Sequence, residues 1–87
     1  MLFVFTTDDR HGIVMRDMKI PLDIIWLDRN QRVVHIVKNA SPDLGESRVF
    51  QPVTPARYVL EVNAGTATRF NITVGSEAQF ILPEPSL

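Results

Sequence analysis

The chain has 87 residues, of which 45% are hydrophobic, so it predicts a single folded domain over residues 1–87 and excludes a disordered chain. Nine basic and ten acidic residues give a net charge of -1 without any charged block, which excludes the clustered Lys and Arg of a nucleic-acid-binding surface. The absence of cysteine excludes disulfides, thiolate catalysis and cysteine-ligated metal sites.

The N-terminal segment, residues 1–5, is apolar and predicts a strand. Thr6 follows at once and no basic residue precedes the apolar run, so the segment lacks the features of a signal peptide and we expect a cytoplasmic protein. No apolar run approaches the roughly 20 residues of a membrane span, so we expect none. Residues 6–12 are polar and end in Gly12, which predicts a loop, and residues 13–15 predict a short strand.

Residues 20–28 predict a long strand, because one side of the alternation, which includes Leu22 and Trp26, is wholly apolar. Residues 28–32 are polar and predict a turn, since Asp and Asn bond to their own backbone in turns. Residues 33–37 are rich in Val and Ile and predict the partner strand of a hairpin. The other side of the first strand is also partly apolar, as in a small barrel or a curved sheet.

The segment from residue 39 to residue 55 predicts the longest loop, because its three prolines cannot donate to a strand ladder. Loops longer than roughly 12–15 residues are usually functional or mobile. We expect Val49 and Phe50 to attach the middle of this loop to the core.

The C-terminal part predicts a strand, a short helix and a closing strand. Residues 57–62 form the first strand, with Tyr58 on its apolar side. The helix lies near residues 65–71, and we expect it to end at Asn71 in the left-handed conformation that Asn tolerates. Residues 77–82 predict the closing strand, which two prolines terminate.

Three blocks of the sequence resemble the domain-of-unknown-function 192 family, also called uncharacterised protein family 0127. They are MRDMKIPLDIIWLD at 15–28, ARYVLEVNAGT at 56–66 continued by ITVG, and the weaker opening MLFVF. The resemblance implies a mainly β fold, a small barrel-like or clam-like curved sheet with one short helix near residues 65–71, followed here by a tail at 83–87. It also implies a prokaryotic source and no established activity, and many relatives are exported.

The chain departs from the family pattern at four places. Val14 stands where an aromatic residue is usual, Asp17 stands where an amide is usual, and the segment after Ala40 lacks the cysteines of many relatives. Most relatives also carry a few dozen residues, including a strand, before the position of Met1. Without that strand one sheet edge would be bare, and bare edges pair. We therefore expect a homodimer through an exposed strand edge, or a domain-swapped form.

The charged residue that stands out is Asp23, which interrupts an apolar strand, because burying a carboxylate is costly unless it is paired or hydrogen-bonded. One interpretation is an acid that contacts a ligand. The other, which we favour, is structural, with Asp23 paired to Arg16 or Arg57 or exposed at the rim of the sheet. The candidate ligand-binding set consists of five charged residues: Arg16, Asp17, Asp23, Arg57 and Glu61.

Catalysis has fewer supporting features. A carboxylate-dependent hydrolase using Asp17, Asp23 or Glu61 is the alternative function, since two carboxylates can act as acid and base. His35 could be a general base, but no nucleophile lies in an elbow motif, so a half-buried sheet residue is the favoured interpretation.

The remaining candidates have simpler explanations. Asp8, Asp9 and His11 could bind a divalent cation, but three ligands do not make a closed site, so we favour a solvated turn and expect no metal and no cofactor. Trp26 and Tyr58 could stack on a sugar or a base, but their apolar parity favours core packing. We therefore expect a non-enzymatic accessory module that binds a small ligand or a protein.

Overall fold

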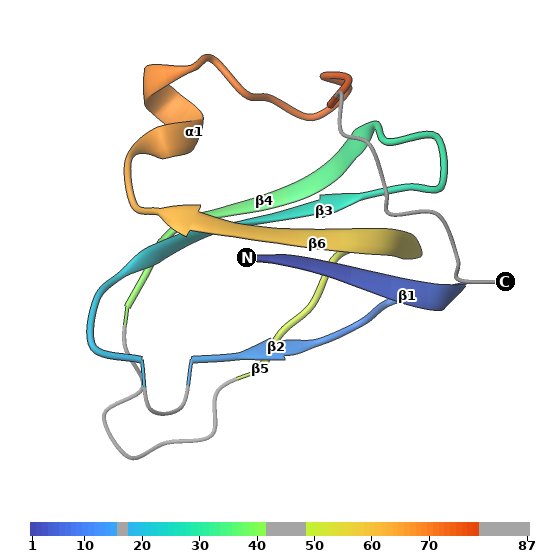
Figure 1. Ribbon diagram of the computed structural model, residues 1–87, viewed down its shortest axis with the longest axis horizontal. Coiled ribbons are helices and arrows are strands. Elements are labelled where there is room, and N and C mark those ends of the chain that lie inside the picture. The colour runs from blue at the N-terminus through green and yellow to red at the C-terminus, as the bar shows by residue number, and fades with distance from the viewer. Residues whose placement is uncertain (16–17, 42–48, 79–87) are drawn as a thin grey trace, which may run out of the picture.

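The computed structural model describes residues 1–15, 18–41 and 49–78 of the chain. Strands dominate this part, and one short helix follows the last of them (Figure 1). The elements are β1 (Leu2–Asp9), β2 (Ile13–Val14), β3 (Leu22–Leu27), β4 (Val33–Ala40), β5 (Val49–Phe50), β6 (Ala56–Asn63) and α1 (Thr66–Arg69). The mainly β class that the sequence predicts is confirmed.

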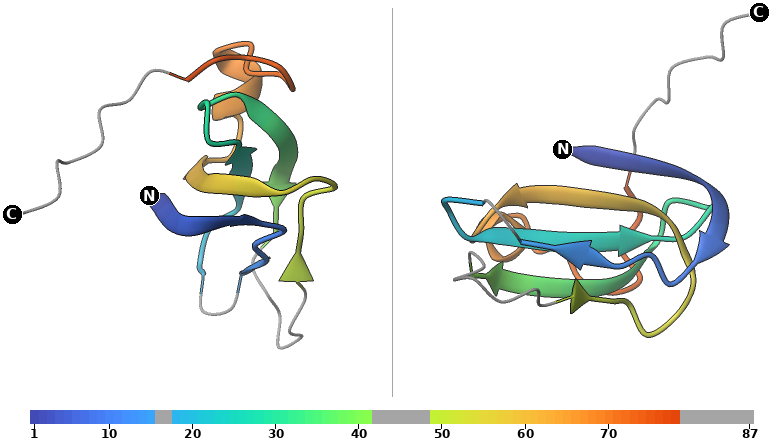
Figure 2. Two further views of the ribbon diagram at one scale, coloured as in Figure 1. Left: turned by 90° about the vertical axis from the view of Figure 1, so that its right-hand side faces the viewer. Right: turned by 90° about the horizontal axis from the view of Figure 1, so that it is seen from below.

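Four of the strands form one antiparallel sheet in the order β1-β6-β3-β4, and β2 and β5 form a separate antiparallel pair. The β2–β5 pair lies on one side of the sheet and α1 lies on the other (Figures 1 and 2). In the described residues β1 and β4 are the two edges, so the sheet is open and curved. The expected barrel is therefore not closed.

Strand β3 runs through the centre of the sheet, and all six of its residues are buried. Alternate side chains of a strand point to opposite faces, so apolar residues of both parities are needed when both faces are covered. Leu22, Ile24 and Trp26 pack toward the β2–β5 pair, on what we term the ribbon face. Ile25 and Leu27 pack toward α1, on what we term the helix face.

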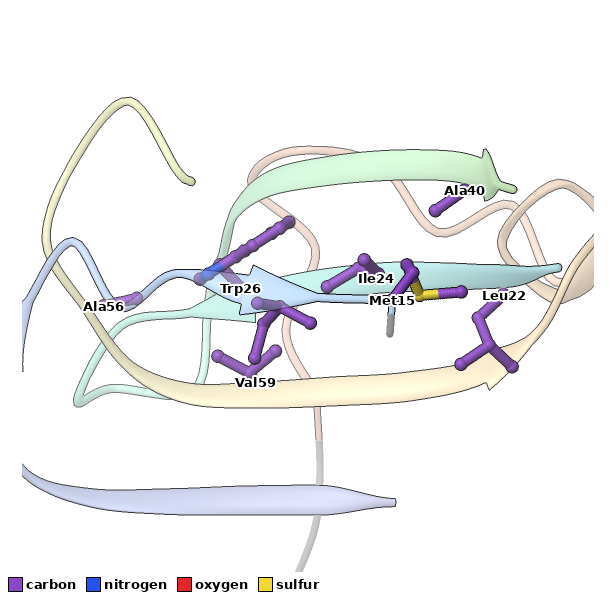
Figure 3. Close-up of a cluster of buried hydrophobic side chains, with 8 residues drawn as sticks. Met15, Leu22, Ile24, Trp26, Ala40, Ala56 and Val59 are labelled. Carbon is purple, nitrogen blue, oxygen red and sulfur yellow. The ribbon is translucent and has the colours of Figure 1, made fainter. Parts of the chain in front are cut away.

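The core of the ribbon face is built around Trp26, which is completely buried. Figure 3 shows its ring beside Val59 of β6, with Ile24 and Met15 further along the same cluster. The indole Nε1 donates a hydrogen bond of 2.8 Å to the carbonyl oxygen of His11. The buried polar atom of the ring is thereby satisfied, as buried Trp requires. The expectation that Trp26 belongs to the core is confirmed.

The core of the helix face lies under α1, whose Ala67 packs with Leu27 and Tyr58. The helix ends where the sequence predicts, because Asn71 has a φ of 54° in the left-handed region. The amide of Ile72 then donates to the carbonyl oxygen of Ala67 at 2.8 Å, which is the bond that closes a helix at such a residue. Only four residues long, α1 cannot cross a membrane, and no other helix occurs in the described part of the chain.

Strand structure occurs in two segments for which the sequence predicts loops. β1 continues to Asp9, which pairs with Ala56 beyond an irregularity in the ladder. Val49–Phe50 pairs with Ile13–Val14, so the middle of the predicted loop 39–55 is strand β5. Both pairings depend on a partner that is distant in sequence, which local composition cannot reveal.

The predicted strand 77–82 is described only at its start. There Glu77 forms an isolated bridge with Arg32 on the outer side of β4. The rest of that strand and the predicted tail at 83–87 lie outside the described residues.

Candidate functional site

Asp23 is buried in β3 with 1% of its surface exposed, and backbone amides satisfy its carboxylate. Its Oδ1 accepts a hydrogen bond of 2.8 Å from the amide of Asn39, and its Oδ2 accepts bonds of 3.1 and 2.9 Å from the amides of Gly65 and Ala67. The expected exposure at the rim of the sheet is therefore wrong, and Arg57, one of the two expected partners, binds Asp8 instead. The other, Arg16, lies outside the described residues. Both oxygens are engaged inside the protein, so this carboxylate is not presented to solvent.

The backbone explains why a carboxylate is needed at this position. Between the pairs Leu22–Ala40 and Ile24–Val37 the ladder shifts, so that two residues of β4 lie opposite Asp23. Such a bulge leaves a backbone amide unpaired, and Asp23 accepts the hydrogen bond of Asn39 at this point. On the other oxygen Asp23 binds the start of α1, where the first amides of a helix lack internal partners. One side chain therefore fixes both the bulge and the helix.

Arg57 of β6 pairs with Asp8 of β1 across the edge of the sheet. The Nε atom of Arg57 donates to Oδ1 of Asp8 at 2.8 Å, and the two side chains are 28% and 37% exposed. Sequence reasoning missed this partner because the two residues are 49 positions apart. The ion pair ties the distal end of β1 to β6.

Glu61 is a partly buried carboxylate near the N-terminal end of β1. Its backbone amide and carbonyl both bond to Met1, at 2.8 and 2.6 Å. Burial raises the pKa of Glu61 above its ordinary value of 4.5, and the ammonium group of Met1 partly opposes this rise. Among the ion pairs of the described residues, none involves the carboxylate of Glu61.

The sheet separates these candidate residues. Glu61 lies opposite Ile24 and Val59 lies opposite Trp26, so the odd residues of β6, Arg57 among them, share the ribbon face. Asp23 points instead to the helix face, where it reaches α1. The structure therefore brings Arg57 and Glu61 to one face and leaves Asp23 on the other.

Two members of the candidate set, Arg16 and Asp17, lie outside the described residues.

The two histidines both belong to the ribbon face. His11 stacks on Phe5 with ring centroids 3.7 Å apart, and its Nε2 lies 2.9 Å from the carbonyl oxygen of Thr7. His35 is half-buried and meets the ring of Trp26 edge-on at 5.3 Å. Within residues 1–15, 18–41 and 49–78, no three His, Asp or Glu side chains gather closely enough to hold a metal ion.

The raised pKa of Glu61 leads to a prediction for stability. Below about pH 4 the carboxyl is protonated in both the folded and unfolded states, so folding does not have to desolvate a charged carboxylate. Above the raised pKa it is ionised in both states, and the folded protein bears the full desolvation cost. The free energy of unfolding should therefore fall as pH rises through this range, and Glu61→Gln should remove that fall. Denaturant unfolding of both proteins from about pH 4 to pH 7 measures the effect; parallel curves would contradict it.

Comparison with known proteins places this architecture among uncharacterised ones. The model of the DUF192 family, described as "Uncharacterized ACR, COG1430", matches residues 1–80. No curated protein matches the chain.

Two solved structures are similar to the chain. One is a protein of unknown function from Novosphingobium aromaticivorans DSM 12444, with a TM-score of 0.83 and 34% identity over 92% of this chain. The other, from Sinorhizobium meliloti 1021, has been suggested to be a transcription regulator; its TM-score is 0.79 and its identity 31% over 86% of this chain. This chain spans 56% and 57% of the length of those two chains.

Proposed function

The chain belongs to the DUF192 family of uncharacterised proteins, and from that premise and the geometry of its ribbon face we propose that it is a non-enzymatic module that binds a ligand or a partner. The proposal concerns this domain alone, because the similar solved chains are considerably longer. A cytoplasmic location, the absence of a nucleic-acid partner and the pairing of two copies through a strand edge stay predictions.

The observation that carries the proposal is the environment of Glu61. The Met1 ammonium offsets only part of the cost of burying this carboxylate, and a bound group that donates hydrogen bonds would offset more of it. Phe3 lies opposite Val59 in the ladder, so an aromatic side chain shares the ribbon face next to Glu61. These surroundings favour a ligand with an ammonium or amide N–H donor attached to an apolar group. Arg57, on the same face, is the second proposed contact.

The other members of the proposed set have different roles. Arg16 and Asp17 precede β3 and stay proposed contacts without a structural test. Asp23 supports the site from inside the protein, because its oxygens hold the backbone of β4 and α1.

A carboxylate-dependent hydrolase is the second candidate, and one observation favours it. Glu61 has a raised pKa, which is a common property of catalytic acids. A hydrolase of the two-carboxylate type needs a second acid on the same side of the substrate. Asp23 is on the opposite face of the sheet, so among the proposed acids only Asp17 could serve as the partner of Glu61.

Titration with n-butylammonium chloride, followed by NMR of the backbone amides, tests the binding proposal. We expect amide shifts confined to residues near Glu61 and Phe3, with a dissociation constant on the order of 1 mM for so small a probe. Glu61→Gln should remove the response, whereas Glu77→Gln, at an exposed ion pair with Arg32, should retain it. The neutral n-butanol serves as the control for the apolar group.

The outcomes separate the two candidates. An absence of shifts near Glu61, or shifts that persist unchanged in Glu61→Gln, would show that this carboxylate is not a binding contact. Hydrolysis of a p-nitrophenyl ester or phosphate that is lost in Glu61→Gln would instead establish the enzyme.

A further inference from the structure

Arg57 and Glu61 place opposite charges on the same face of one strand. Both residues belong to β6, which lies between β1 and β3, so pairing on two sides holds its backbone extended (Figure 1). The two residues are four positions apart, which corresponds to about 13 Å along a strand. Side chains stand roughly perpendicular to a sheet, so the charged groups keep a separation of this order. The ribbon face therefore presents a cation and an anion at a fixed spacing.

The surface between the two charges is apolar. Val59 lies midway between them on β6, and Phe3 lies opposite Val59 in the β1–β6 ladder. Val59 is completely buried, whereas Phe3 and Phe5 are only partly buried at the margin of the ribbon-face core. A molecule that reached from one charge to the other would pass beside Phe3. Its middle part would gain free energy by covering apolar surface.

The guanidinium of Arg57 has hydrogen-bond donors that are not used inside the protein. Its Nε atom donates to Oδ1 of Asp8 at 2.8 Å, and in the part of the chain that the structure describes no hydrogen bond engages its two Nη atoms. The two Nη atoms form a fork that can bind both oxygens of a carboxylate. Asp8 thus orients the guanidinium from one side and leaves the fork for a second acceptor. The side chain is partly exposed, so that acceptor can come from solvent.

We infer that the ligand of the proposed site is an extended zwitterion, of the class of short peptides with free termini, whose ammonium binds Glu61 and whose carboxylate binds Arg57. The inference rests on the proposed function, because it uses the same Glu61 contact and adds the second half of the ligand. Four extended residues span about 13–14 Å, which matches the spacing of the two side chains. The ligand then runs antiparallel to β6, with its amino end beside Glu61.

Charge complementarity distinguishes this ligand from simpler ones. A simple cation can satisfy only Glu61, and a simple anion can satisfy only Arg57. A zwitterion of matching length satisfies both, and its second contact forms within a complex that the first already holds together. The spacing therefore selects the length of the ligand, and the order of the two charges along β6 selects its direction.

Titration with tetraalanine at pH 7, followed by NMR of the backbone amides, tests the inference. We expect tetraalanine with free termini to bind about threefold more tightly than tetraalanine amide, which lacks the carboxylate and therefore one partly exposed ion pair. Tetraalanine should shift amides at both ends of segment 57–61, whereas n-butylammonium should shift only those near Glu61. Dialanine spans about 7 Å and should gain nothing over its own amide.

Three variants separate a binding contact from a structural one. Arg57→Gln should abolish the advantage of the free acid over the amide. Asp8→Asn keeps an acceptor for Nε of Arg57 but removes a competing carboxylate, so it should increase that advantage. If the ion pair only held the sheet together, both variants would change binding in the same direction. Arg32→Gln, at an exposed ion pair with Glu77, is the matched control and should leave the advantage unchanged.

The results also separate this inference from the proposed function. If n-butylammonium shifts the amides near Glu61 but tetraalanine and its amide bind equally, the zwitterionic ligand is wrong and the proposed function stands. Changes in the same direction for Arg57→Gln and Asp8→Asn would likewise overturn the zwitterionic ligand. If neither n-butylammonium nor tetraalanine shifts those amides, the proposed function fails and this inference fails with it.

Discussion

Replacing Trp26 by alanine should lower the free energy of unfolding by about 3–5 kcal/mol, because Trp26 is the largest of the fully buried side chains in the described residues. The indole is completely buried in the ribbon-face core, and its removal leaves a cavity beside Val59 and Ile24 (Figure 3). It also deprives the carbonyl oxygen of His11 of its hydrogen-bond donor. Since a domain of this length has a total stability on the order of 10 kcal/mol or less, the variant should be close to unfolding.

Guanidinium unfolding followed by far-ultraviolet circular dichroism measures this loss, because Trp26→Ala removes the sole tryptophan. Phe70→Ala provides the matched control, since Phe70 is 64% exposed and its truncation should change stability by less than about 0.5 kcal/mol. Comparable losses in the two variants would show that Trp26 is not at the centre of the core.

Asp23→Ala should cost about 3 kcal/mol, because three backbone amides lose their acceptor at once. Two of those amides belong to the start of α1 and one to the bulge of β4, all in or near the buried interior. We expect the unfolding midpoint to fall and the amide resonances of Gly65, Ala67 and Asn39 to shift or broaden. Asp23→Asn should be nearly as damaging, because its amide nitrogen would face a backbone N–H.

The control for Asp23 is Asp28, an aspartate that accepts two backbone hydrogen bonds where Asp23 accepts three. Oδ1 of Asp28 bonds the amides of Asn30 and Arg32 at 2.8 and 3.0 Å in the polar β3–β4 turn. Water can replace those bonds, so Asp28→Ala should cost about 1 kcal/mol. If Asp23→Ala were no worse than Asp28→Ala, Asp23 would not have the structural role that its three bonds indicate.

Several features of the fold could be predicted from local sequence. The alternation in residues 20–28 and 57–62 predicts two core strands, since the period of a strand decides which side chains face inward. The polar turn at 28–32 predicts the β3–β4 hairpin, and Asn71 predicts the end of α1. Each of these signals is contained within a few consecutive residues.

Other features had no local signal. β5 is strand because Val49–Phe50 meets Ile13–Val14, and β1 reaches Asp9 because it meets β6. The strand order β1-β6-β3-β4 likewise depends on pairings between segments that are distant in sequence. A sequence shows that a segment is able to form a strand, but whether it does so depends on a partner strand that is distant in sequence.

For the candidate site too, local sequence predicts some features and the fold supplies the others. The position of Asp23 in an apolar strand already predicts that its charge must be compensated, because a buried carboxylate is costly without a partner. The fold supplies this compensation through backbone amides that are 16, 42 and 44 positions away, which no local pattern could reveal. The fold also pairs Arg57 with Asp8, and the strand register places Asp23 on the face opposite Arg57 and Glu61. The residue type and its apolar neighbours show that burying the charge is costly. The hydrogen-bond donors that offset this cost are distant in sequence, and folding brings them to Asp23.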